Sequence, residues 1–177
     1  SDVCSSDLLP QANEIFSIHA IDSMKVIAVG EFGTILRSVN GGTSWESNSF
    51  VNGISARLNN VMFQNSSNGW IVGDSGTMLK TINQGSSWAK ITSLSTKKNL
   101  HSVWFLDSDT GYIVGDSGTI LKTTNKGTSW SVLNSGVTEN LYSVTFTNPQ
   151  NGIIVGNKKI LRSTNFGNSW PNQIGRA

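Results

Sequence analysis

The feature that most constrains this chain is a motif that occurs four times at nearly constant spacing. Each copy has the form Ser/Thr-x-Asn-x-Gly-x-Ser-Trp, and its tryptophan recurs every 40 to 43 residues. The copies occupy residues 38–45, 81–88, 123–130 and 163–170. A period of about 40–45 residues is typical of one four-stranded propeller blade. The sequence lacks the long apolar stripes of period 3.6 that helical repeats of this length require.

Each repeat divides further into short runs typical of strands, separated by turn residues. In the third repeat the runs are Leu100–Leu106, Gly111–Gly115, Thr119–Thr124 and Ser129–Leu133, rich in β-branched and aromatic residues. The sequence therefore predicts an all-β β-propeller with four blades of four antiparallel strands, at about 13–52, 53–95, 96–136 and 137–172. Rings of this repeat type more often contain six to eight blades, so we expect an open-arc fragment of a larger ring.

The motif itself, called the box below, has a structural interpretation. The Asn side chain accepts hydrogen bonds from nearby backbone N–H groups, the Gly takes a conformation that a side chain would forbid, and the Trp packs on the sheet. We therefore interpret the box residues as scaffold rather than as a ligand site. They are Asn40, Gly42, Trp45, Asn83, Gly85, Trp88, Asn125, Gly127, Trp130, Asn165, Gly167 and Trp170.

Neither end of the chain fits the repeat. Residues 1–8 and 173–177 contain Cys-Ser-Ser-Asp-Leu and Gln-Ile-Gly-Arg-Ala, which correspond to translations of the two strands of a common sequencing adapter. We expect both segments to be sequencing artefacts around a biological segment at about 9–172, which would make this a metagenomic fragment without its true N-terminus. Cys4, the only cysteine, would then not be native, and neither a disulfide framework nor a thiol nucleophile would remain.

The repeat extends upstream of the box as Gly-x-x-Gly-Thr-Ile-Leu-Lys/Arg, for example at Gly115–Lys122. Over residues 13–170 it resembles the photosystem II stability/assembly factor family. It is also similar to the Asp-box, or bacterial neuraminidase, repeats of sialidases, sortilin-type receptors and xyloglucanases. The resemblance implies a propeller, in many relatives a secreted or cell-surface binding module. The chain departs from the family in having Asn where Asp is commoner in the box. It also departs in the fourth repeat, where the turn Asn157-Lys158-Lys159 is one residue shorter between Gly156 and Ile160.

The sequence offers little support for catalysis. A sialidase needs an arginine cluster and a Tyr nucleophile, but only Arg37, Arg57 and Arg162 remain once the end segments are set aside, and Tyr112 and Tyr142 lie within strand patterns. Asp74 and Asp116 occupy equivalent turn positions, where a turn-forming role is the more frequent one. We therefore predict no enzyme activity and no catalytic residue.

Cofactors, metals and nucleic acids are also not predicted. His19 and His101 stand at no metal-ligand spacing from cysteines or carboxylates, and no phosphate-binding Gly-Lys-Ser/Thr follows a strand. The formal net charge of +2 is too small to indicate nucleic acid, and no apolar run is long enough to span a membrane.

Two surfaces could bind a partner. The first is a row of cations one position after the repeated Leu, which would suit an acidic polypeptide; the alternative is local pairing with Glu31, Asp74 or Asp116. This row, called the basic row below, comprises Arg37, Lys80, Lys122 and Arg162. The second is the face opposite the boxes, with Arg57, Lys97 and Lys98, where solvated loop charge is the alternative.

The first-strand residues His101, Trp104 and Tyr142 differ between repeats. They either approach the central channel of the propeller or pack in the core.

We expect a non-catalytic binding or assembly module in an extracytoplasmic location. It would hold a protein or peptide partner, with an acidic polypeptide among the candidates. The alternative is part of a carbohydrate-active enzyme of the sialidase or xyloglucanase type.

Overall fold

The computed structural model describes residues 13–48, 53–92, 94 and 96–171. The segments expected to be sequencing artefacts, including Cys4, lie outside the described residues. Within the described ranges the regular structure consists of strands and two single-turn 3₁₀ segments, Glu31–Gly33 and Asp74–Gly76. No described helix has the length and apolar character needed to cross a membrane.

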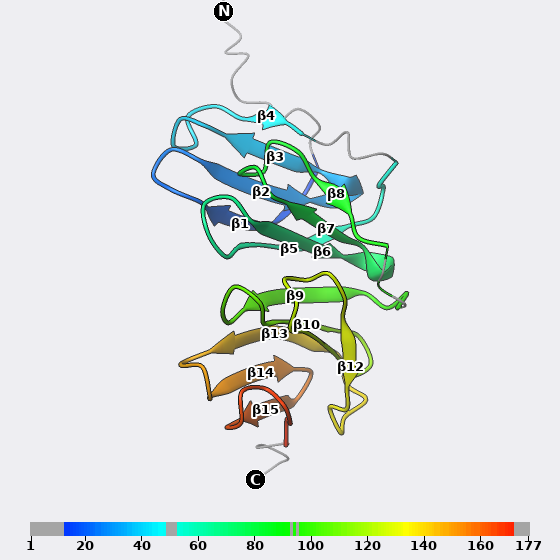
Figure 1. Cartoon of the computed structure of the whole chain (residues 1–177). Coiled ribbons are helices and arrows are strands. Elements are labelled where there is room, and N and C mark those ends of the chain that lie inside the picture. The colour runs from blue at the N-terminus through cyan, green and yellow to red at the C-terminus, as the bar shows by residue number, and fades with distance from the viewer. Residues whose placement is uncertain (1–12, 49–52, 93, 95, 172–177) are drawn as a thin grey trace, which may run out of the picture.

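The strands form four antiparallel sheets that follow one another in chain order (Figure 1). Within each sheet, strands adjacent in the sequence pair with each other. The first two sheets comprise β1 (Ile15–Ala20), β2 (Val26–Gly30), β3 (Ile35–Ser38), β4 (Glu46–Ser47), β5 (Leu58–Phe63), β6 (Gly69–Gly73), β7 (Met78–Thr81) and β8 (Ala89–Lys90). The last two comprise β9 (Leu100–Phe105), β10 (Gly111–Gly115), β11 (Thr119–Thr123), β12 (Ser131–Leu133), β13 (Leu141–Phe146), β14 (Gly152–Gly156) and β15 (Lys159–Ser163).

This arrangement confirms the predicted all-β blades. In the third repeat every strand boundary lies within two residues of the predicted one. The described part of the fourth sheet has three strands. There the backbone N–H of Arg162 donates to the carbonyl of Pro171 at 3.3 Å, at the edge of β15 where the other blades carry their fourth strand.

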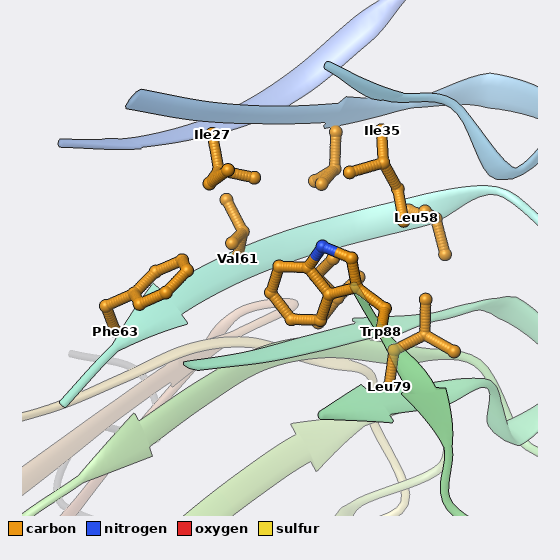
Figure 2. Packing of buried hydrophobic residues seen from close by; sticks show 9 residues of the cluster. Ile27, Ile35, Leu58, Val61, Phe63, Leu79 and Trp88 are labelled. Carbon is orange, nitrogen blue, oxygen red and sulfur yellow. The ribbon is translucent and has the colours of Figure 1, made fainter. Parts of the chain in front are cut away.

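The core lies between the sheets. The first strand of each blade contacts the first strand of the next, so β1, β5, β9 and β13 lie side by side. Each of the first three blades then turns three apolar residues of its second and third strands toward the following blade. These triplets are Ile27, Val29 and Ile35; Trp70, Val72 and Met78; and Tyr112, Val114 and Ile120. All nine are at most 1% exposed, and Figure 2 shows Ile27 and Ile35 facing Leu58, Val61 and Trp88 of the second blade.

The box tryptophan completes an aromatic stack in three of the blades. Phe63 lies over Gly69, where a Cβ would come within 2.7 Å of the ring, and Trp88 meets Phe63 edge-on at 5.8 Å between centroids. The corresponding Phe–Trp pairs in the third and fourth blades have the same edge-on geometry. The first blade has Ala20 opposite Val26 instead, so Trp45 lacks this partner.

The hairpin between the second and third strands has a similar backbone conformation in the first three blades. In the first three blades its Gly has a φ of 67 to 70°, as the turn residues predict. The residue before it, Phe32, Ser75 or Ser117, is also left-handed, as in the type I′ turns that match strand twist. In the fourth blade Gly156 pairs directly with Lys159, so the turn is one residue shorter, as predicted.

Candidate functional site

The box is a closed hydrogen-bonded turn with the same bonds in all four copies. In the third copy Asn125 Oδ1 accepts from the backbone N–H of Ser129 at 3.0 Å, and from the Thr123 hydroxyl at 2.9 Å. Asn125 Nδ2 donates to the Ser129 hydroxyl at 2.8 Å, and the N–H of Gly127 donates to Thr123 Oγ1 at 3.1 Å. The box side chains are therefore engaged with one another, which leaves the Asn little capacity to hold a ligand.

Three of the boxes also lie against the blade before them. A Cβ added to Gly85 would come within 2.6 Å of Ile27, one on Gly127 within 2.8 Å of Trp70, and one on Gly167 within 2.5 Å of Tyr112. Each of these partners lies on the second strand of the preceding blade. The box glycine is thus required twice, for its left-handed φ and for the close approach of two blades.

The basic row reaches the same boxes. Arg37 Nε donates to the carbonyl of Gln84 at 3.4 Å, and Lys80 Nζ to that of Lys126 at 2.8 Å. Lys122 Nζ lies 3.4 Å from the carbonyl of Phe166 and 2.6 Å from Asn168 Oδ1. In each case the acceptor belongs to the box of the following blade. Burial lowers the pKa of both Lys80 and Lys122, as expected when a cation is held against neighbouring side chains.

The structure does not support the alternative that the basic row pairs with carboxylates of its own hairpins. Among the described residues no ion pair joins the basic row to Glu31, Asp74 or Asp116. The side chain of Arg162 is exposed, and no hydrogen bond or ion pair to it occurs within the described ranges. Partner binding by the basic row stays a prediction, and contacts between blades already occupy three of its four members.

A second row of residues lies at the other edge of the blades, where the first strand begins. In every blade the pairing of the first and second strands skips one residue: Ile15 and Ser17 pair with Gly30 and Val29, which leaves Phe16 as a bulge. The bulged residues of the four blades are Phe16, Asn59, His101 and Tyr142. Bulges redirect side chains and are frequent at functional sites. We call these four residues the bulge row.

The bulge row is linked from blade to blade by its own contacts. The guanidinium carbon of Arg57 lies 3.6 Å from the centroid of the Phe16 ring. Asn59 Nδ2 donates to Asp74 Oδ1 at 2.8 Å and to the carbonyl of Leu100 at 2.9 Å.

Towards the fourth blade, His101 Nε2 lies 2.7 Å from Asp116 Oδ1, and its ring lies 5.4 Å from that of Tyr142. Tyr142 is 48% exposed. The row thus presents aromatic, amide and imidazole groups along one edge, with the guanidinium of Arg57 beside them.

The residues predicted on this face lie beside the bulge row. The hairpin and the linker to the next blade meet here, because Gly76 N–H donates to the carbonyl of Lys98 at 2.9 Å. Lys98 Nζ lies 3.4 Å from the carbonyl of Ser117, and Lys97 is exposed. An open hollow of about 500 Å³ has Arg57, Asp74 and the 53–56 loop on its walls. Trp104, by contrast, packs against the core cluster between the third and fourth blades.

Sequence reasoning missed Phe16 and Asn59. A signal was present: each follows the apolar residue that opens the first strand, and the residue at this position differs in kind in all four repeats while its apolar neighbour recurs. The structure brings the predicted residues Arg57, His101 and Tyr142 to the same edge.

The carboxylates and the tyrosine weighed above for catalysis are engaged with neighbouring groups or buried. Asp74 and Asp116 are engaged by Asn59 and His101. Tyr112, weighed as a nucleophile, is fully buried, and burial raises its pKa to about 12. In the part of the chain that the structure describes, no three His, Cys, Asp or Glu residues gather closely enough to hold a metal ion.

The model of one protein family matches this chain almost throughout. The family is described as photosynthesis system II assembly factor YCF48, and the matches cover residues 5–82 and 81–174. The chain belongs to this family. No match was found among curated proteins.

Solved structures of YCF48 share the fold. YCF48 from Cyanidioschyzon merolae has a TM-score of 0.75 at 22% identity, over 96% of this chain and 59% of that one. A structure of YCF48 bound to D1 peptide has a TM-score of 0.64 at 18% identity, over 93% and 82% of the two chains. This chain therefore spans somewhat over half the length of the Cyanidioschyzon merolae protein.

Glycoside hydrolases share the same architecture. An ancestral GH74 enzyme has a TM-score of 0.76 at 21% identity, over 93% of this chain and 24% of the enzyme. At this level of identity the similarity shows the propeller fold alone.

Proposed function

We propose that this YCF48-family chain is a non-catalytic module that holds a protein or peptide partner, and that the bulge row forms the contact surface. The observation that carries the proposal is the repeated bulge, which places Phe16, Asn59, His101 and Tyr142 at one edge of four successive blades. A repeated β-bulge with a variable side chain provides a surface whose chemistry can change without disturbing the sheets.

The groups on this edge suit an extended polypeptide. Tyr142 offers an exposed aromatic ring for apolar side chains. Arg57 stacks on Phe16, and within the described ranges no carboxylate lies in ion-pair distance of it. Its guanidinium therefore keeps N–H groups for an acidic side chain or a C-terminal carboxylate. The existence of a YCF48 structure with bound D1 peptide supports a peptide as the partner class.

The experiment is a peptide-display selection against the whole chain, with the D1 peptide included as a defined probe. We expect a family of related peptides to be enriched. The triple variant Arg57→Ala, His101→Ala and Tyr142→Ala should lose the enriched peptides, whereas Val132→Ala should keep them. Val132 is a matched control because it is 71% exposed on β12.

Two outcomes would contradict the proposal. One is that the triple variant binds the enriched peptides as strongly as the parent chain. The other is robust turnover of fluorogenic glycosides by the chain, which would favour a carbohydrate-active enzyme instead.

A further inference from the structure

An exposed phenylalanine stands at the tip of the first blade's hairpin, in a backbone conformation that phenylalanine rarely adopts. Phe32 is 66% exposed and has a φ of 50°. Type I′ turns need two left-handed residues and therefore favour Asn, Asp or Gly, and a bulky residue there is an outlier. The second and third blades have Ser75 and Ser117 at this position. The strain at Phe32 is not offset by burial, because most of its side chain is in solvent.

The exposure of Phe32 comes from its place within the blade. Ser75 and Ser117, at the equivalent positions, are exposed as well. The second and third blades nevertheless have a neighbouring blade on both sides, through the contacts of their first strands. The tip of this hairpin therefore lies outside the contacts between blades in every case, and the first blade differs by placing an aromatic ring there.

The hairpin that carries Phe32 is held in place by backbone hydrogen bonds on both sides. The N–H of Gly33 donates to the carbonyl of Ala56 at 2.8 Å, and the N–H of Glu31 donates to the carbonyl of Glu14 at 2.9 Å. The ring is thus presented by a turn whose backbone is already ordered. Binding through a pre-organised group costs less ordering entropy than binding through a free loop.

The same bonds place Phe32 next to the first members of the bulge row. Arg57 follows Ala56 in the chain, and its guanidinium carbon lies 3.6 Å from the centroid of the Phe16 ring. Phe16 is half-buried and lies two residues after Glu14. Two aromatic rings and a guanidinium therefore meet where the first blade adjoins the second.

A hollow beside this group carries positive charge. It is the open hollow of about 500 Å³ described above, and Ala56, Arg57 and Lys90 line it. Within the described ranges no carboxylate lies in ion-pair distance of Arg57 or Lys90. Asp74 also lines the hollow, but its carboxylate accepts from Asn59. The surroundings of Phe32 therefore suit a segment that carries both an apolar and an acidic side chain.

We propose that Phe32 anchors an apolar side chain of the peptide partner, close in the peptide sequence to the acidic group that Arg57 receives. This inference rests on the proposed function and adds a specificity-determining residue outside the bulge row. A single exposed apolar residue is common and indicates little by itself. Phe32 combines exposure with backbone strain, which is frequent at ligand contacts, and a few such anchors carry most of the energy of an interface.

The experiment is a selection from a phage-displayed library of random linear peptides, run in parallel on the parent chain and on Phe32→Ser. The parent should enrich peptides in which Leu, Phe or Trp stands close to Asp or Glu. Phe32→Ser should keep the acidic preference and lose the apolar one. A synthetic peptide from the parent selection should bind Phe32→Ser about 10-fold or more weakly, and should bind Phe32→Trp as it binds the parent.

Phe166→Ser is the matched control. Phe166 is also a phenylalanine with a left-handed φ, 58°, and is 46% exposed, but it belongs to the fourth box, at the opposite edge. This variant should bind the synthetic peptide as the parent does. Equal losses in Phe32→Ser and Phe166→Ser would show a general effect of exposed aromatic rings and would overturn the proposal.

Urea unfolding separates an anchor from a structural residue. Phe32→Ser should unfold at the same urea concentration as the parent or at a higher one, because the turn loses a bulky left-handed residue and no buried contact is removed. A structural role would give the opposite result. Unfolding of Phe32→Ser at a lower urea concentration than the parent would overturn the assignment of Phe32 as an anchor.

The two proposals can be told apart by their variants. If Phe32→Ser binds the synthetic peptide as tightly as the parent while the Arg57→Ala, His101→Ala, Tyr142→Ala variant does not, the anchor is wrong and the proposed function stands. The reverse result would contradict the bulge row and leave the apolar anchor standing. If the parent chain enriches no peptide, both proposals are overturned.

Discussion

The two edges of these blades use repetition in opposite ways. At the box edge the four copies agree in sequence and in hydrogen bonding, and three boxes lie against the blade before them. At the bulge edge the β-bulge is repeated in every blade, but the bulged residue changes from Phe to Asn to His to Tyr. Constancy therefore accompanies the joining of blades, and variation is found at the edge that we propose as the partner-binding surface.

A pair of glycine substitutions gives the strongest test of whether the box edge joins the blades. Gly127→Ala should reduce the free energy of unfolding by about 3 kcal/mol, because left-handed strain adds to a clash with Trp70 of the preceding blade. Gly42→Ala should reduce it by about 1 kcal/mol, since only the strain applies in the first box. Urea unfolding measures both, and equal losses would show that the box does not act between blades.

The second test removes the turn from one box. Asn125→Ala should reduce the free energy of unfolding by about 2 kcal/mol, because the backbone N–H of Ser129 and the Thr123 hydroxyl lose their acceptor. Asn125→Asp keeps that acceptor and should cost less than about 1 kcal/mol. If the two variants unfolded at the same urea concentration, the acceptor would not be what holds the box.

The third test uses pH. The Tyr112 hydroxyl donates to the carbonyl of Phe166 in the next box, and its pKa of about 12 lies above its ordinary value. The neutral phenol therefore stabilises the fold: this contribution is complete below about pH 10 and is lost as pH rises towards 12.

Tyr112→Phe should cost about 1 kcal/mol at neutral pH through the lost hydrogen bond. It should also remove the Tyr112 contribution to alkaline unfolding. Thermal melts of parent and variant between pH 8 and about 12 provide the measurement, and parallel curves would contradict this role for Tyr112.

The smallest effect distinguishes two members of the basic row. Lys122→Met keeps most of the aliphatic chain but loses the bonds to Asn168 and Phe166, and should cost about 0.5–1 kcal/mol. Arg162→Met should change the stability of the monomer by less than about 0.5 kcal/mol, as is usual for exposed sites. Urea unfolding measures both, and a larger loss at Arg162 would reverse the assignment.

Much of the fold follows from the sequence because its signals are local. The spacing of the box tryptophans predicted the blades, and the Gly and Asn positions predicted the turns. Most partners of the basic row were not predictable, since Arg37, Lys80 and Lys122 each reach a backbone carbonyl of the next blade, and a carbonyl has no residue type to identify it. The bulge was hidden for a related reason: it is set by strand pairing, and residues as different as Phe16 and Asn59 occupy it.

The central claim is that the bulge row binds the partner and the box edge joins the blades. The most direct measurement is the dissociation constant of one selected peptide for the parent chain, for the Arg57→Ala, His101→Ala, Tyr142→Ala variant, and for Lys122→Met. The account predicts at least about 10-fold weaker binding for the first variant, which corresponds to about 1.4 kcal/mol, measured at a temperature at which circular dichroism shows both chains to be folded. It predicts an unchanged dissociation constant for Lys122→Met. Weaker binding by Lys122→Met with no change in the triple variant would contradict it.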